Sequence, residues 1–223
     1  MIKTVLALAL AAGMAAGSAH GASLSFSNAN SLTPISQDGI LDLFDANIGT
    51  LHKVRLTLSG TGNSTFVLNN TSGSGQTVTA SSVILMYFSS SLPSLNTTLD
   101  VLMPALQMQA STGPVSLDAG MGARIGPVIS SATLTLDTLT PGLFAQAGGG
   151  NFTIYCENSD DRQLAGGNST VTLGLVTQAG CGATVEYDYT PRASPIPEPT
   201  SMALLGLGMA GLLATVRRRK RGG

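Results

Sequence analysis

The feature of this sequence that most constrains its fold is the alternation of apolar and polar residues in several short segments. In residues 53–59, Val54, Leu56 and Leu58 alternate with polar or charged residues. Successive side chains of a β-strand point to opposite faces, so this alternation predicts a strand with one face on a core and the other in solvent. The same pattern recurs at residues 133–136, 170–175 and 184–190.

Other segments complete a pattern of short strands. Residues 83–88 are apolar on both strand faces, which predicts a central strand. Residues 99–108 are ambiguous, because Pro104 interrupts them and a short helix before the proline is one interpretation. Turn-forming residues separate the apolar runs at 59–63, 69–75, 120–127, 148–151, 166–168 and 179–182. This spacing predicts an all-β fold, an antiparallel β-sandwich of jelly-roll-like or immunoglobulin-like type with about eight to eleven strands.

Composition and charge argue against a helix-rich fold and against a nucleic-acid-binding protein. The 223 residues include 27 Gly, 24 Ser and 24 Thr but no Trp, a composition that disfavours a helix-rich fold. Residues 22–194 hold five Lys or Arg against eleven Asp or Glu. A domain with this negative charge should repel nucleic acid and anionic lipid, so we expect no nucleic-acid partner.

The first residues have the features of a secretory signal peptide. A single Lys3 precedes an apolar run from Val5 to Ala16, and small residues follow where a signal peptidase needs them. Cleavage after Gly21 fits best, so residues 1–21 are predicted to be removed; cleavage after Ala19 is the second choice. We therefore expect export through the Sec system and signal peptidase.

The C-terminal end has three parts in order. Residues 191–199 form a Pro-rich linker that contains Pro197, Glu198 and Pro199; residues 200–216 form a predicted short transmembrane helix; and residues 217–223 form a basic tail. The uncharged apolar run 202–216 spans only about 22 Å as a helix, against about 30 Å for a bilayer core, so it needs snorkelling arginines to cross. The positive-inside rule places the tail in the cytoplasm and the linker outside.

These three parts resemble the PEP-CTERM sorting signal. The resemblance covers residues 195–221 and is carried by Pro197, Glu198 and Pro199, the Leu/Gly-rich helix, and the basic residues Arg217, Arg218 and Arg219. It implies an exosortase as processing partner, an inner-membrane intermediate, and delivery to the cell surface or extracellular matrix of a Gram-negative, exopolysaccharide-producing bacterium. The alternative is an ordinary tail anchor after a proline linker.

The predicted domain at residues 22–190 resembles the choice-of-anchor E family. The opening segment 43–60 shares its Phe-Asp pair, the Gly-Thr-Leu that follows and the alternating strand, and segment 185–190 is similar to its last strand. The resemblance implies a surface protein of unassigned activity.

Cys156 and Cys181 are the two cysteines of the sequence. An exported chain enters an oxidising compartment, so a disulfide between them is expected, and closing its loop should stabilise the fold by about 3 kcal/mol. Phe152, Ile154 and Cys156 share one strand face, which points the Cys156 sulfur inward, whereas Cys181 is predicted to lie in the Gly-rich turn 179–182.

Patterns for catalysis or for cofactor binding are scarce, so we expect no enzyme and no cofactor. Within residues 22–223, His52 is the one histidine, and its neighbours indicate a solvated loop residue. A weak calcium candidate is Glu157, Asp160 and Asp161, in a predicted acidic turn that does not match an EF-hand; a merely solvated turn is the competing interpretation, and Asp42 with Asp45 is a second acidic pair.

We therefore predict a secreted, non-enzymatic surface or matrix protein with a structural or adhesive role linked to exopolysaccharide. The alternative is a carbohydrate-binding module for the producer's exopolysaccharide. Sugar-binding surfaces use Trp or Tyr faces, and this chain has four tyrosines, of which Tyr187 and Tyr189 share the phase of Val185 and are predicted to lie in the core.

Overall fold

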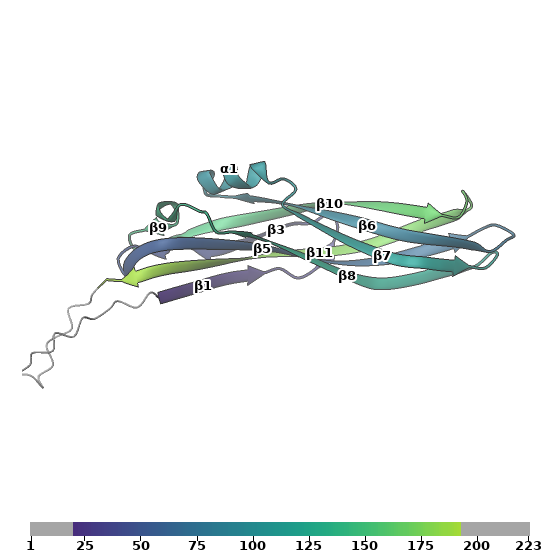
Figure 1. The fold of residues 1–223 in the computed structure, drawn as a ribbon, viewed down its shortest axis with the longest axis horizontal. Helices are drawn as coiled ribbons and strands as arrows, with labels where there is room; N and C mark the ends of the chain where they lie inside the picture. Colours follow the sequence, from purple (N-terminus) through teal and green to yellow (C-terminus); the bar gives the residue numbers. More distant parts are fainter. Residues whose placement is uncertain (1–19, 193–223) are drawn as a thin grey trace, which may run out of the picture. The chain divides into compact units, whose positions relative to one another are not determined.

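A computed structural model describes residues 20–192, which fold mainly as β-strands (Figure 1). The chain divides into two units, the first of which ends at Pro191. The described part of the first unit, residues 20–191, is called the body below and holds all eleven strands of the described residues. The predicted all-β class is confirmed.

Sheet A of the body has four long antiparallel strands in the order β1-β11-β5-β8. A two-residue strand, β2, also pairs with β11. Gly49 lies opposite Pro191 at one end of the β5–β11 pair and Asn70 lies opposite Val171 at the other. The strands are β1 (His20–Ser27), β2 (Ser31–Leu32), β5 (Gly49–Asn70), β8 (Gly122–Leu136) and β11 (Val171–Pro191).

Sheet B also has four long antiparallel strands, in the order β3-β10-β6-β7. They are β3 (Ser36–Asp42), β6 (Gln76–Ser90), β7 (Leu106–Leu117) and β10 (Asn151–Gly166). Two short parallel strands, β4 (Phe44–Asp45) and β9 (Ala145–Gln146), pair beside the sheets. The helix α1 (Pro93–Val101) connects β6 to β7, and a single 3-10 turn, η1 (Pro141–Leu143), precedes β9.

The strand order matches one of the two predicted sandwich types. Each connection between long strands crosses from one sheet to the other, except the connection from β6 to β7 within sheet B. A jelly roll has eight strands in two sheets, whereas an immunoglobulin constant-type domain has four strands on three. Two sheets of four long strands fit the jelly-roll-like alternative.

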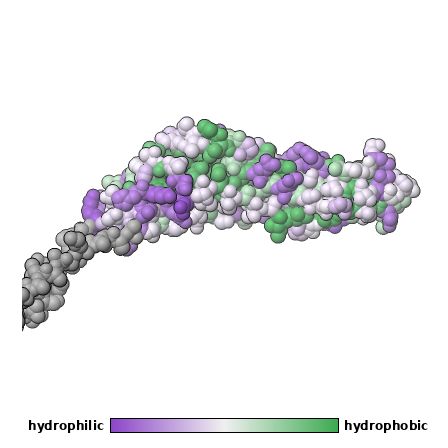
Figure 2. All heavy atoms as spheres, in the orientation of Figure 1, coloured by the Kyte–Doolittle hydropathy of each residue, from purple (hydrophilic) through white to green (hydrophobic). Residues whose placement is uncertain are grey.

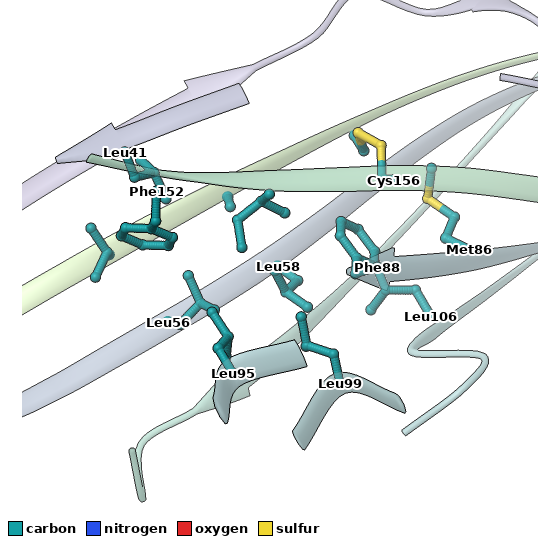
Figure 3. Packing of buried hydrophobic residues seen from close by; sticks show 14 of the residues in the cluster. Leu41, Leu56, Leu58, Met86, Phe88, Leu95, Leu99, Leu106, Phe152 and Cys156 are labelled. Carbon is teal, nitrogen blue, oxygen red and sulfur yellow. A yellow bond between two sulfur atoms is a disulfide. The ribbon is translucent and has the colours of Figure 1, made fainter. Parts of the chain in front are cut away.

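The larger of two core clusters fills the space between the sheets near the end where the chain enters and leaves the body. It contains inward-facing residues of both sheets, among them Leu56 and Leu58 of β5 and Phe88 of β6 (Figure 3). Leu95 and Leu99 of α1 are also buried in it, one turn apart on the same helix face. The helix therefore covers an open side of this cluster.

The middle of the body is packed with small residues. A Cβ atom on Gly60 would lie 2.3 Å from the Met86 Sδ atom of the opposite sheet. Next along β5, the buried Ser64 hydroxyl is hydrogen-bonded to the Ser82 hydroxyl at 2.8 Å. Beyond this point the second cluster begins, and the core is therefore divided in two. The second cluster consists of Phe66, Leu68, Val78, Ala80, Ala110, Leu117 and Val171.

Several predicted strands are confirmed with their predicted faces. The side chains of Val54, Leu56 and Leu58 are fully buried. Residues 83–88 lie in β6, which pairs with β10 on one side and β7 on the other, so the predicted central position is confirmed. Only one face of this strand is buried, that of Ile84, Met86 and Phe88, and the apolar residues between them are half-buried on the outer face. The helix before Pro104 is confirmed as α1, which begins at Pro93, a residue suited to the first helical position.

Two of the predicted turns are wrong. Residues 59–63 lie inside β5 and residues 179–182 lie inside β11, where the two segments pair with each other, Ser59 opposite Gly182 and Gly62 opposite Ala179. Their glycines allow close packing instead of chain reversal: a Cβ on Gly182 would lie 2.7 Å from the backbone oxygen of Phe26. Tertiary packing therefore explains these Gly-rich segments.

The predicted turn at 120–127 is largely wrong, because β8 already begins at Gly122. Residues 118–121 make the reversal between β7 and β8. Gly126 and Pro127 form a bulge in β8, since Ser64 pairs with Val128 and Phe66 with Ile125. Gly126 has φ +125°, and a Cβ there would lie 2.6 Å from the Ser64 carbonyl oxygen, so the bulge needs glycine.

The body is slightly longer than the predicted domain at 22–190, because β1 begins at His20 and β11 ends at Pro191. The predicted signal peptide lies outside the described residues except for its last two positions, which belong to β1. The Pro-rich linker from residue 193 on, the predicted transmembrane segment 200–216 and the basic tail also lie outside them. Within residues 20–192, no helix has the length and apolarity needed to cross a membrane.

Candidate functional site

Cys156 in β10 and Cys181 in β11 form the predicted disulfide. The bond joins the two sheets, because β10 belongs to sheet B and β11 to sheet A. Both cysteines are buried in the larger cluster, and their Cα atoms are 6.7 Å apart. The backbone N–H of Cys181 donates to the side-chain oxygen of Gln37 in β3 at 3.2 Å. The pairing is confirmed, but Cys181 lies in a strand, not in the predicted turn.

The carboxylates of the weak calcium candidate do not converge. β10 continues to Gly166, so Glu157, Asp160 and Asp161 lie along a strand instead of an acidic turn. Glu157 and Asp161 share the outer face of sheet B, whereas Asp160 has the opposite phase. Within residues 20–192, no group of three or more His, Cys, Asp or Glu side chains is placed to hold a metal ion.

The second acidic pair, Asp42 and Asp45, is used in loop closure and in strand pairing. The Asp45 carboxylate accepts hydrogen bonds from the backbone N–H groups of Asn47 and Gly148, both at 2.8 Å. Asp42 pairs with Asn151 at the end of β3. These contacts give both residues a structural role.

Tyr187 is confirmed as a core residue. Its hydroxyl donates to the backbone oxygen of Asp42 at 2.7 Å, and its ring packs edge-on against Phe44. Burial, and secondly the nearby Asp42 carboxylate, raise the pKa of Tyr187 far above that of a free tyrosine. Tyr189 is partly buried against the same Phe44 ring.

A groove of about 470 Å³ lies on sheet A where β1, β11 and β5 run side by side. The Arg55 guanidinium contacts the Glu186 carboxylate at 3.2 Å, and Lys53 lies opposite Asp188 in the strand register. Figure 2 shows a strongly hydrophilic surface in this region of the body. Opposite charges at alternate positions of residues 53–55 and 186–188 are the signal for this groove in the sequence, but the pairing of β5 with β11 that forms it is not predicted by periodicity. Its lining is Gly21, Ala22, Ser23, Lys53, Arg55, Glu186, Tyr187 and Asp188.

His52 lies near this groove but belongs to β5, not to the predicted loop. It is exposed, as expected, and its Nε2 atom lies 2.8 Å from the Thr190 hydroxyl oxygen. This contact links the ends of two paired strands, which is a structural role.

A second groove of about 470 Å³ runs between α1 and the end of β8. Its walls are mainly apolar or methyl-bearing, and Val101 at its rim is 82% exposed. Figure 2 shows hydrophobic surface in the region of α1. The groove is lined by Thr97, Thr98, Val101, Leu102, Leu136 and Thr138.

The other two tyrosines lie on the outer face of sheet B. Tyr155 of β10 is 45% exposed, and Tyr87 of β6 is half-buried, with its hydroxyl 3.3 Å from the Ser159 hydroxyl. Tyr87 pairs with Glu157 and Tyr155 with Ser89, so the two tyrosines are diagonal neighbours on adjacent strands. Their strand phase was readable from the sequence, but the pairing of β6 with β10 was not.

Comparison with known proteins adds a sorting motif outside the described residues. The PEP-CTERM protein-sorting motif matches residues 195–220, which confirms the predicted motif but not the choice-of-anchor E resemblance of the body. No curated protein matches this chain.

Among solved structures, the chain is similar to virus particle and coat proteins at 10% identity. It covers 44% of a chain from the infectious bursal disease virus T13 particle, with 84% of this chain aligned and a TM-score of 0.20. It covers 96% of the tobacco streak virus coat protein, with 84% aligned and a TM-score of 0.19. The chain thus spans about half the length or less of the first virus chains it matches. Scores this low carry no argument about fold or function.

Proposed function

We propose that this protein is exported and delivered to the cell surface by an exosortase. The observation that carries the proposal is the PEP-CTERM motif at residues 195–220, which follows directly on the end of the body. In this proposal, Pro197, Glu198 and Pro199 are the recognition site outside the membrane. Arg217, Arg218 and Arg219 hold the basic end on the cytoplasmic side of the inner membrane until processing.

In its final place the body has a structural or adhesive role in an exopolysaccharide layer and performs no catalysis. Two features support this role: a jelly-roll-like body with long paired strands, and a disulfide that joins its two sheets and suits an oxidising exterior. The resemblance to choice-of-anchor E domains remains a prediction that agrees with a surface location.

The second candidate function is that of a carbohydrate-binding module for the producer's exopolysaccharide. What favours it is the position of Tyr87 and Tyr155 on the outer face of sheet B, since sugar-binding surfaces use aromatic rings. The two candidates share the same route of export and differ in whether the body binds sugar chains with measurable affinity.

The sorting proposal is tested by intact-protein mass spectrometry on fractionated cells that express the chain with or without a matched exosortase. With the exosortase, the surface or medium fraction should contain a form that lacks the signal peptide and the residues after the Pro-Glu-Pro region. A Glu198→Ala variant should stay in the membrane fraction, and a Glu186→Ala variant in the body should be sorted like the wild type. A C-terminal segment retained in both strains would refute exosortase processing.

A further inference from the structure

We propose that the outer face of sheet B binds a neutral polysaccharide along β6. This inference rests on the proposed function, because it names the class of polymer that the surface-sorted body contacts. The central feature is a row of three half-buried side chains, Val83, Leu85 and Tyr87, at alternate positions of one strand. We call this row the β6 stripe; at about 3.3 Å per residue it is about 13 Å long.

Polar side chains border the β6 stripe on both sides. Leu85 lies between Ser159 of β10 and Gln107 of β7, and Val83 lies between Asp161 and Gln109 in the same way. Gln107, Gln109 and Asp161 are all exposed. A sugar ring has an apolar C–H face and a rim of hydroxyl groups, so an apolar floor between amide and carboxylate side chains suits it.

The backbone of β6 favours a sugar chain over a peptide. A peptide that binds by strand addition needs a free strand edge. β6 has no such edge over the stripe, since β10 and β7 occupy both of its sides. Recognition at the stripe must therefore come from side chains alone.

The negative charge of the outer face of sheet B favours a neutral polysaccharide over an anionic one. Asp38, Glu157 and Asp161 have outward-facing positions in β3 and β10, and within residues 20–192 no Lys or Arg shares this face of sheet B. Anionic polysaccharides and anionic lipids are repelled by such a surface. A second copy packed face to face would bring the same carboxylates together, which also disfavours a dimer through this face.

The test is affinity electrophoresis of the full-length protein in mild detergent, in native gels that contain hydroxyethylcellulose, galactomannan or dextran, with alginate as the anionic polymer. We expect retardation by at least one neutral polymer and none by alginate. The double variant Gln107→Ala/Gln109→Ala should bind about tenfold more weakly, because it removes two amide hydrogen-bonding groups. Tyr155→Ala should also weaken binding, because it removes an exposed aromatic ring.

The matched control is Gln178→Ala, which removes an exposed glutamine from a strand of sheet A. It should bind as the wild type does, and all variants should keep the wild-type melting temperature. The inference is overturned if no neutral polymer retards the protein, if alginate alone does, or if Gln178→Ala weakens binding as much as the double variant. Association between copies that the double variant abolishes would assign the face to a dimer. The intact mass of the sorted form is unaffected by these outcomes, so a failure here is distinct from a failure of the sorting proposal.

Discussion

The disulfide between Cys156 and Cys181 should account for a large part of the stability of the body. It links residues 25 positions apart in the sequence and joins sheet A to sheet B. Loss of a cross-link over a loop of this size costs about 3 kcal/mol in the chain-entropy model. With a urea m value of about 2 kcal/mol per molar, the midpoint of unfolding of a Cys156→Ala/Cys181→Ala variant should fall by about 1.5 M.

The assay is urea unfolding followed by far-UV circular dichroism, with and without a reducing agent. The reduced wild type is the matched control, because its two thiols still fill the buried positions and only the covalent link is lost. Its midpoint should lie close to that of the double alanine variant, with the remaining difference due to packing. If reduction leaves the midpoint unchanged while both thiols are shown to be free, the reasoning from loop closure is refuted.

Two further predictions concern buried polar groups. Asn70 is fully buried and its amide donates to the backbone oxygens of Ser74 and Asp118 at 2.9 and 3.0 Å, so Asn70→Ala should destabilise the body by about 2–3 kcal/mol in urea unfolding. Its exposed neighbour provides the control, since Asn69→Ala should change stability by less than about 0.5 kcal/mol. The pKa of Tyr187 is raised in the folded state, so the folded protein keeps this proton at a pH where the unfolded chain loses it. The contribution of Tyr187 to the free energy of unfolding is therefore constant below pH 10, the pKa of an unfolded tyrosine. Above pH 10 it falls by about 1.4 kcal/mol per pH unit. Tyr187→Phe should remove this loss between pH 10 and 11, and an identical pH dependence in the variant would contradict the assignment.

Sequence periodicity predicted strands correctly where the buried positions hold apolar side chains, but not in the Gly-rich segments. Val54, Leu56 and Leu58 point inward as their phase requires, and Phe152, Ile154 and Cys156 do the same in β10. A two-residue period says which face of a strand is buried, but it does not say which strands are neighbours. The groove on sheet A and the polar borders of the β6 stripe both depend on strand neighbours, and for this reason the sequence did not predict them.

The acidic segment of β10 shows a second reason for error. Glu157, Asp160 and Asp161 belong to residue types of low or modest strand propensity, and the sequence therefore favoured a turn there. In the fold this segment pairs with residues 83–87 of β6, and the ladder extends on to Gly166. Because the propensity differences are small, a long partner strand outweighs them, and the carboxylates are spread along the strand instead of gathered around an ion.

Gly60 offers the sharpest test of the packing explanation for the predicted turns. It lies inside β5, and a Cβ there would lie 2.3 Å from Met86 Sδ, so Gly60→Ala should destabilise the body by about 1–3 kcal/mol through overpacking. In a Met86→Ala background the closest side chain is absent, and the remaining neighbours, Leu106 Cδ1 at 3.2 Å and Met108 Cε at 3.3 Å, are ends of side chains that need to shift by only a few tenths of an ångström. The same Gly60→Ala change should then be neutral or stabilising, because alanine loses less backbone entropy than glycine in a strand. Urea unfolding of the four proteins of this cycle gives the coupling energy. An equal cost of Gly60→Ala in both backgrounds would mean that backbone conformation, and not contact with the opposite sheet, is what requires glycine in the middle of β5.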